Sequence, residues 1–158
     1  MNREISIFNG VGSLIFSKHE VISLFKALDS SKYSIQDGDL SIAFLTTGNM
    51  VAIHGKFMGD DTGTDVITFP GDSNMGFAGE ICVSPDYAIG SHLEHGTTFS
   101  EELTLYLIHG YLHLFGLDDV SEADTVWMRD GEKFCMELVK NKNCMPKFFY
   151  DNLCSCKE

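Results

Sequence analysis

The chain has 158 residues, the length of one ordinary domain, and its 44% apolar and 22% charged residues exclude disordered and fibrous classes of protein. Its formal net charge of −12 argues against nonspecific nucleic-acid binding over the whole surface, because such binding uses many lysines and arginines to neutralise phosphates. No apolar stretch reaches the length of a membrane span, and the N-terminal residues lack the pattern of a secretory signal, so we expect one domain over residues 1–158 and no membrane partner.

The first part of the chain alternates between expected strands and helices. A short strand is expected over residues 3–8. Residues 17–20 form a capping box, and the apolar residues after it recur at helical spacing, which predicts an amphipathic helix over residues 18–30. Alternating apolar residues predict a strand over residues 40–46, and residues 49–57 are expected to form a second helix.

The middle of the chain predicts a pair of neighbouring strands. The second helix is expected to end near Gly59, and residues 64–69 then form a strand that the Pro-Gly pair at residues 70–71 would stop. Residues 77–83 form the next strand. The link between the two is short and consists of small and polar residues, which indicates antiparallel pairing. Residues 85–95 are expected to form a helical turn or a short helix.

Two longer helices follow. A capping box at residues 98–101 opens a helix that runs to about Phe115 and is largely buried, because apolar residues surround it. A last helix is expected over residues 121–140. Four apolar residues lie on one stripe of it: Ala123, Trp127, Phe134 and Leu138. The tail beyond about residue 141 is not placed. This order of elements predicts an α+β fold with a central mixed four-stranded sheet packed with about five helices.

The chain has five cysteines, an odd number without framework-like spacing, which favours free thiols in a reducing compartment. We therefore expect a cytoplasmic protein. Cys144, Cys154 and Cys156 lie near the C-terminal end, where two interpretations are open: a second metal site, or plain thiols.

Two histidines lie four residues apart in the buried helix. His109 and His113 fall one turn apart on the same helical face, where both imidazoles can bind one ion. The spacing alone is a weak signal, because such pairs also arise by chance. Two partnerless imidazoles inside an apolar helix would, however, be costly. Gly116 is the residue type that ends a helix in a left-handed turn, and that turn can bring Asp119 toward the same ion.

We therefore predict a site for one divalent metal ion, Zn²⁺, held by His109, His113 and Asp119. Two histidines with one carboxylate also suit iron, so another divalent metal is the alternative. Asp118 is the competing ligand, but its expected role is to accept hydrogen bonds from backbone amides in the turn.

The segment from His109 to Asp119 resembles two known patterns. It resembles the metzincin pattern H-E-x-x-H-x-x-G-x-x-H/D, except that Gly110 occupies the place of the protease's general-base glutamate. It is more similar to the YbeY family signature, H-G-x-L-H-x-x-G-x-D-H, from which only Asp119 departs. Residues 58–70 and 79–81 are similar to further motifs of that family, and the likeness covers roughly residues 40–130.

This resemblance implies a zincin-like fold and a metal-dependent endoribonuclease that cleaves single-stranded RNA in ribosomal RNA processing and ribosome maturation. The implied partners are ribosomal RNA and the small ribosomal subunit, and no DNA is expected. The metal would lower the pKa of a bound water and polarise a phosphodiester oxygen. Beyond that water, no catalytic group is indicated.

The resemblance also implies a substrate groove formed by Lys56, Met58, Thr64 and Asp65. In zincin-like folds an edge strand borders the metal cleft, so Thr64 and Asp65 could contact the substrate, whereas Asp65 could equally cap or pair locally. Met58 occupies the place of a family arginine thought to stabilise phosphate charge, and Lys56 is the candidate substitute.

Two alternatives to a ribonuclease remain open at this point. Met58 and Asp119 depart from the family pattern, which would suit a non-catalytic ribosome-assembly factor with a structural metal. The second alternative is another metal hydrolase, and Gly110 argues against a peptidase among these.

Overall fold

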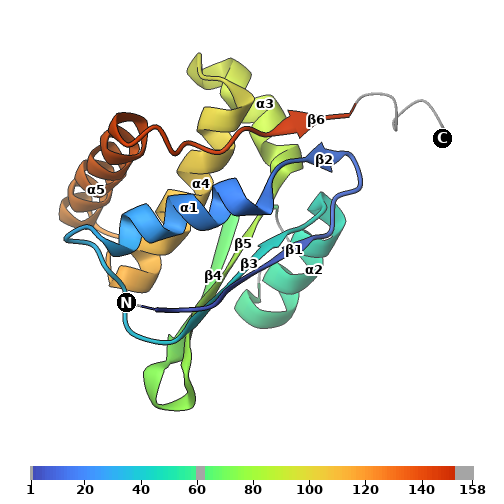
Figure 1. Ribbon diagram of the computed structural model, residues 1–158. Helices are drawn as coiled ribbons and strands as arrows, with labels where there is room; N and C mark the ends of the chain where they lie inside the picture. Colours follow the sequence, from blue (N-terminus) through green and yellow to red (C-terminus); the bar gives the residue numbers. More distant parts are fainter. Residues whose placement is uncertain (1, 60–62, 152–158) are drawn as a thin grey trace.

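A mixed four-stranded sheet organises the fold in the computed structural model, which describes residues 2–59 and 63–151 (Figure 1). The strand order is β1-β3-β5-β4, in which β1, β3 and β5 are parallel and β4 is an antiparallel edge strand. The strands of this sheet are β1 (Ile5–Asn9), β3 (Asp39–Phe44), β4 (Val66–Asp72) and β5 (Phe77–Val83). The expected antiparallel pair of strands is therefore confirmed.

Five helices surround this sheet within the part of the chain that the structure describes. They are α1 (Lys18–Asp29), α2 (Thr47–Met58), α3 (Pro85–His95), α4 (Phe99–Phe115) and α5 (Glu122–Asn141). A single 3-10 turn, η1 (Ser73–Met75), joins β4 to β5. The predicted α+β class, with a mixed four-stranded sheet and about five helices, is confirmed.

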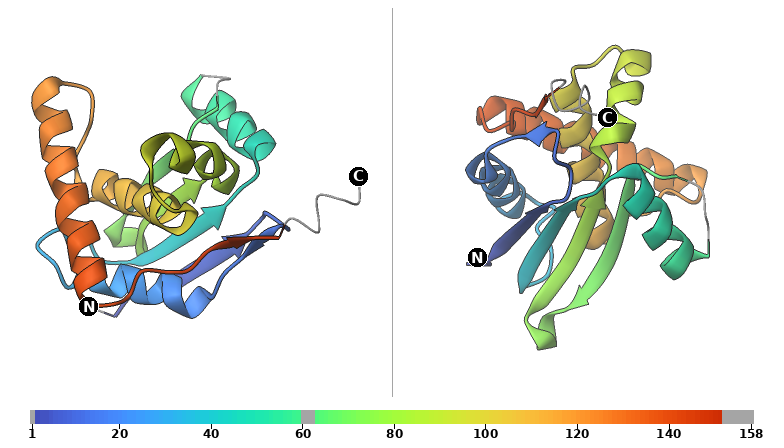
Figure 2. Two further views of the ribbon diagram at one scale, coloured as in Figure 1. Left: turned by 90° about the horizontal axis from the view of Figure 1, so that it is seen from above. Right: turned by 90° about the vertical axis from the view of Figure 1, so that its right-hand side faces the viewer.

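The helices divide between the two faces of the sheet, as the two views of Figure 2 show. The larger core lies on the face covered by α1, α4 and α5, and it contains fully buried Phe25, Ile42 and Tyr111. A smaller core lies under α2 on the opposite face, around Met50 and Ile67. Helix α4 packs between the sheet and α5, so its position is fixed on both sides.

Local sequence signals explain most helix boundaries. Ser17, Thr46, Thr98 and Ser121 each accept a hydrogen bond from the backbone N–H three residues on, which satisfies one of the unpaired donors at a helix N-terminus. Gly59 ends α2 with φ of 67°, a left-handed conformation that suits glycine, as expected.

Two expectations about element boundaries were wrong. Strand β4 does not stop at residue 70 but continues to Asp72, and Pro70 pairs with Gly79. Proline has no backbone N–H to donate. It is tolerated there because β4 is an edge strand, whose outer side has no neighbouring strand to bond. Helix α2 begins at Thr47, two residues before the expected start, because Thr46 rather than a later residue caps it.

The tail beyond about residue 141, which the sequence left unplaced, contains one short strand within the described residues. Strand β6 (Phe149–Tyr150) pairs with β2 (Leu14–Ile15) in a small antiparallel sheet, and the buried Phe148 packs against the ring of Phe16. Two-residue strands carry no periodic signal, so the sequence did not indicate them.

The structure also bears on the cysteines and on the membrane expectation. Cys82, Cys135 and Cys144 are free thiols, whereas Cys154 and Cys156, the other members of the possible second metal site, lie outside the described residues. Among the described helices, none is both long and apolar enough to cross a membrane.

Candidate metal centre

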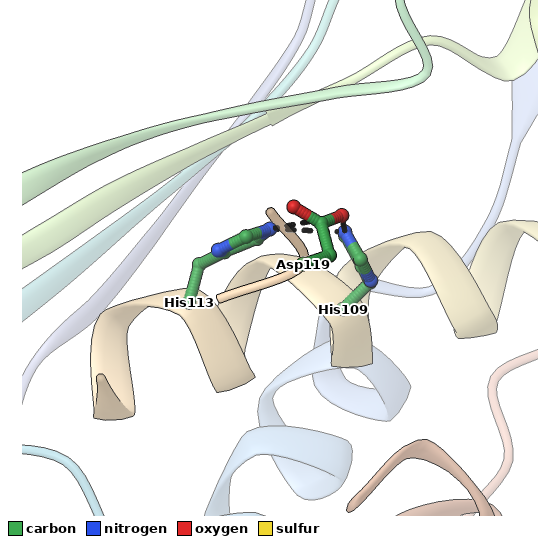
Figure 3. Close-up of side chains that lie close together, drawn as sticks. All are labelled: His109, His113 and Asp119. Carbon is green, nitrogen blue, oxygen red and sulfur yellow. Dashed lines mark hydrogen bonds and ion pairs between the residues drawn. The ribbon is translucent and has the colours of Figure 1, made fainter. Parts of the chain in front are cut away.

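Helix α4 places two imidazoles next to each other (Figure 3). His109 and His113 lie one turn apart on the same face, and their Nε2 atoms are 3.0 Å apart. A complete capping box between Thr98 and Glu101 defines the start of the helix, and the sheet buries one side of it. Both histidines therefore point into the same space from a rigid element.

Asp119 reaches these histidines from the loop after α4. Gly116 has a φ of 118° and ends the helix with backbone hydrogen bonds to Leu112 and His113, which turns the chain back along the helix. As a result, Oδ2 of Asp119 lies 3.4 Å from Nε2 of His109 and 3.9 Å from Nε2 of His113. The structure thus brings together the three residues that were predicted as ligands.

The three ligand atoms fit a divalent ion such as zinc. Tetrahedral zinc with bonds of about 2.0–2.1 Å requires ligand atoms about 3.4 Å apart. The observed separations of 3.0, 3.4 and 3.9 Å bracket this value. Asp118 instead accepts a hydrogen bond from the backbone N–H of Asp119 at 2.8 Å, which is the role expected for it in the turn.

Glu132 of α5 orients His109 from the other side. Nδ1 of His109 lies 2.8 Å from Oε1 of Glu132, and only 7% of the glutamate side chain is exposed. Because a carboxylate only accepts, the imidazole donates its Nδ1–H and keeps the lone pair of Nε2 for a metal. This is the usual arrangement behind a metal-binding histidine in proteins.

The sequence interpretation missed Glu132 because it chose the wrong stripe of the last helix. Trp127 and Phe134 are exposed, whereas the buried stripe consists of Met128, Gly131, Glu132, Cys135 and Val139. A glutamate within an otherwise apolar buried stripe is the signal that could have revealed this residue.

The charges around His109 favour a cation at this position. Burial lowers the pKa of His109, but the hydrogen bond and charge of Glu132, together with Asp119 and Asp65, outweigh it, so the pKa is raised. Burial raises the pKa of Glu132, but its contacts with His109 and Arg129 outweigh this, so its pKa is lowered. The surroundings that stabilise a protonated imidazole also stabilise a bound divalent ion.

Two cavities meet at the centre. The cavity on the His109 side, of about 390 Å³, is lined among others by Asp65, Tyr87, Glu102, Arg129 and Glu132. The cavity on the His113 side, of about 360 Å³, is lined by residues of α2 and β4, including His54, Met58 and Thr68. Asp119 lines both, so the three candidate ligand residues stand where the two cavities meet.

Comparison with known proteins identifies the family of this chain. The family model described as Endoribonuclease YbeY matches residues 15–140, a range that includes every residue of the centre. The chain belongs to the YbeY endoribonuclease family. Its relatives include the Endoribonuclease YbeY of Protochlamydia amoebophila, which is 36% identical over 132 residues, or 81% of this chain and 87% of that protein.

Two further similarities extend over nearly the whole chain. The Endoribonuclease YbeY of Thermodesulfovibrio yellowstonii is 27% identical over 158 residues, covering 89% of this chain and 99% of that protein. The solution structure of TM1509 from Thermotoga maritima superposes with a TM-score of 0.60 at 28% identity, covering 87% of this chain and 90% of that one.

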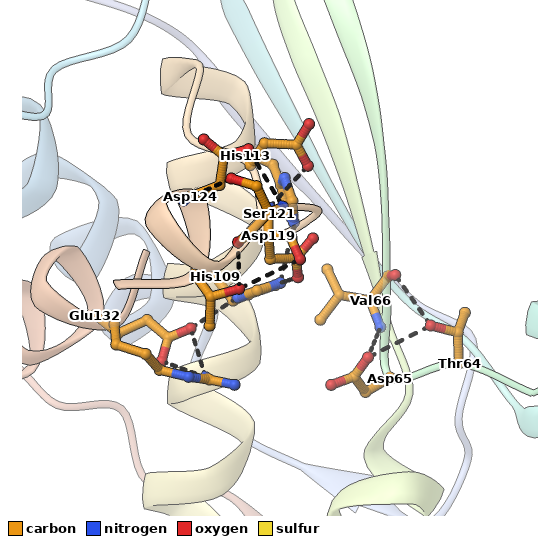
Figure 4. A network of polar contacts seen from close by, with 12 residues as sticks. Thr64, Asp65, Val66, His109, His113, Asp119, Ser121, Asp124 and Glu132 are labelled. Carbon is orange, nitrogen blue, oxygen red and sulfur yellow. Dashed lines mark hydrogen bonds and ion pairs between the residues drawn. The ribbon is translucent and has the colours of Figure 1, made fainter. Parts of the chain in front are cut away.

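The residues expected to form the YbeY substrate groove differ in their relation to the centre. Asp65 lines the His109 cavity, and Met58 lines the His113 cavity. Thr64 contacts Asp65 and the carbonyl of Val66, so it supports the start of β4 (Figure 4). Lys56 lies with its Nζ over the ring of Phe57, 5.3 Å from the centroid, and is not among the residues that line either cavity. Asp65 also pairs locally, because its Oδ1 accepts the backbone N–H of Val66 at 2.9 Å.

Close packing against the sheet explains why residue 110, a position of the YbeY signature, is a glycine. A Cβ at this position would lie 2.5 Å from Cγ2 of Ile81 and 3.1 Å from Cγ1 of Val66, which is too close for a side chain of any size. Residue 110 therefore faces the sheet and not the cavities, and α4 approaches the sheet closely. A protease-like glutamate has no space at this position.

Proposed function

We propose that this protein is a metal-dependent endoribonuclease that cleaves single-stranded RNA in ribosomal RNA processing and ribosome maturation. The observation that carries the proposal is the convergence of His109, His113 and Asp119 at the junction of two cavities, in a chain that belongs to an endoribonuclease family. Its partners would be ribosomal RNA and the small ribosomal subunit.

One Zn²⁺ per chain is the cofactor we propose for this centre, with Nε2 of His109, Nε2 of His113 and Oδ2 of Asp119 as ligands. When bound, the ion would supply Lewis acidity and an activated water for hydrolysis of a phosphodiester. Glu132 holds the proton of His109 on Nδ1, which keeps Nε2 available. Asp119 contributes a negative charge from an exposed loop position, so it reduces the net charge of the loaded centre.

The RNA would lie across the junction of the two cavities. Asp65 and Met58 support this placement, because they line the His109 cavity and the His113 cavity respectively. Thr64 and Lys56 would act at its border, Thr64 by fixing the start of β4. The net charge of −12 favours a factor that meets its RNA on the ribosome, where ribosomal proteins help to place it, and the free thiols of Cys82 and Cys135 suit the cytoplasm.

The test compares nucleic acids of the same sequence. Purified protein is incubated with a single-stranded ribosomal RNA fragment, its duplex form and the matching DNA, before and after removal of metal with a chelator and again after addition of zinc. We expect cleavage of the single-stranded RNA alone, its loss with the chelator and its recovery with zinc. Bound zinc without cleavage would contradict the proposal and favour an assembly factor, and cleavage of a peptide substrate would favour another hydrolase.

A further inference from the structure

The chain contains only two arginines, and their surroundings differ sharply. The side chain of Arg3 is 2% exposed and is held by the carboxylate of Asp29 and by backbone carbonyls, including that of Gly38. The side chain of Arg129 is 67% exposed and lines the His109 cavity. Only Arg129 is therefore placed to bind a ligand that enters from solvent.

The His109 cavity is strongly acidic. Its carboxylates come from Asp65, Glu94, Glu102, Asp119 and Glu132. Among the described residues that line it, Arg129 is the sole arginine or lysine, and the described lining of the His113 cavity includes neither type. These carboxylates thus repel a polyanionic strand that approaches the centre. Besides a bound metal, Arg129 is the lysine or arginine of these linings that can offset the repulsion.

The guanidinium of Arg129 is fixed along one edge only. Its Nη1 donates to both carboxylate oxygens of Glu132, at 3.0 and 2.9 Å. The opposite edge, made by the parallel N–H groups of Nε and Nη2, has no acceptor among the described residues. This edge has the spacing and direction that bind two oxygens of one phosphate.

Glu132 links this edge to the metal centre. The same carboxylate that holds Arg129 accepts the Nδ1–H of His109, so two hydrogen bonds connect the guanidinium to a ligand residue. Both contacts involve a side chain that is nearly buried, which limits the positions available to the guanidinium.

We propose that Arg129 forms a phosphate-binding subsite beside the metal centre and binds a backbone phosphate of the RNA through its Nε and Nη2 edge. The inference rests on the proposed function, because it takes RNA as the ligand. Within the described linings of the two cavities Arg129 is the one lysine or arginine, since Met58 is uncharged and Lys56 lies outside both. Glu132 then serves twice, as the support of His109 and as the anchor of Arg129.

Three variants separate a phosphate contact from a structural role. Arg129→Gln removes the charge but keeps an amide that can donate to Glu132, and Arg129→Lys keeps the charge but loses the two-pronged edge. Lys133→Gln is the matched control, because it removes the same charge from an exposed position one turn further along α5. For each zinc-loaded protein we would measure zinc content and the Kd of a fluorescent single-stranded RNA over a salt series, at a temperature where the RNA stays intact.

We expect Arg129→Gln to bind the RNA about 10- to 100-fold more weakly, as for the loss of one charged hydrogen-bonding contact. Its plot of log K against log salt should be less steep by about 0.7, the contribution of one phosphate on a single strand. Arg129→Lys should fall between this variant and wild type. Lys133→Gln should match wild type, and all variants should retain zinc.

Two results would overturn the subsite. Arg129→Gln could bind RNA as tightly as Lys133→Gln, with the same salt slope, in which case Arg129 contacts no phosphate. It could instead lose zinc together with RNA affinity, in which case Arg129 acts only through Glu132 and His109. If wild type fails to cleave any RNA but Arg129→Gln alone weakens binding, the proposed function fails and the subsite stands.

Discussion

Glu132 shows at the residue scale how much of the centre depends on a side chain that touches no metal. It fixes the tautomer of His109 and anchors Arg129, and both contacts depend on its negative charge. The motif from His109 to Asp119 could be read from the sequence because its members are local. Glu132 could not, because its role depends on which stripe of α5 faces α4, and Trp127 and Phe134 suggested another stripe.

Replacement of Glu132 by glutamine tests this role directly. Glu132→Gln keeps the size of the side chain but removes its charge, so the Nδ1–H of His109 loses a charged acceptor. We expect zinc affinity to fall about 10- to 100-fold. Competition with a chromophoric chelator measures the affinity, and Glu137→Gln, at an exposed position of the same helix, is the control. Equal affinities for the two variants would show that Glu132 does not support the centre.

At the scale of elements, α4 was predicted most accurately, because its signals are local and agree with one another. The capping box at Thr98, the surrounding apolar residues and Gly116 all define the same helix. Strand β4 was predicted less well, because Pro70 is a local stop signal that only its edge position in the sheet overrides. The pairing of β2 with β6 depends on contacts across most of the chain, for which the sequence holds no local signal.

The close approach of α4 to the sheet leads to a stability prediction. Gly110→Ala places a methyl group against Ile81 and Val66, so the helix or the sheet must shift. We expect the free energy of unfolding to fall by about 1–3 kcal/mol, as for other overpacked cores. Urea titration measures this loss. Gly90→Ala, at a helical position where an added Cβ would meet no atom within 4 Å, should not be destabilised. A Gly110→Ala protein as stable as wild type would contradict the close packing.

At the scale of the whole molecule, the net charge of −12 was known from the sequence, but its distribution was not. The sequence could not tell that Arg3 is buried beside Asp29 while Arg129 lines a cavity, because both answers depend on tertiary contacts. The same holds for the cysteines. Their number indicated free thiols, and the fold then shows that Cys82 and Cys135 are buried in the two separate cores.

Because of these thiols, we expect the free energy of unfolding to fall at alkaline pH. Burial raises the pKa of Cys82, with help from Glu80, and burial raises that of Cys135, both from 9.0 to about 12. Above about pH 9 the unfolded chain releases protons that the folded chain retains. The contribution to stability is therefore complete below pH 9 and is lost as the pH rises toward 12.

Urea titrations at pH 8 and pH 10 would measure this dependence. We expect wild type to lose more of its free energy of unfolding between the two pH values than a Cys82→Ala/Cys135→Ala variant does. Comparing each protein with itself removes the cost of the substitutions. The same loss in both proteins would mean that these thiols do not titrate differently in the folded and unfolded states.

The most direct test of the account is the zinc content of wild-type protein and Asp119→Ala, each assayed in parallel on single-stranded ribosomal RNA. Asp119 contributes one of three ligand atoms from a loop, and its side chain is 47% exposed, so its loss should leave the fold intact. We predict one zinc per wild-type chain with RNA cleavage, and loss of both in Asp119→Ala. Wild-type protein without stoichiometric metal, or an Asp119→Ala protein with unchanged metal and activity, would contradict the account.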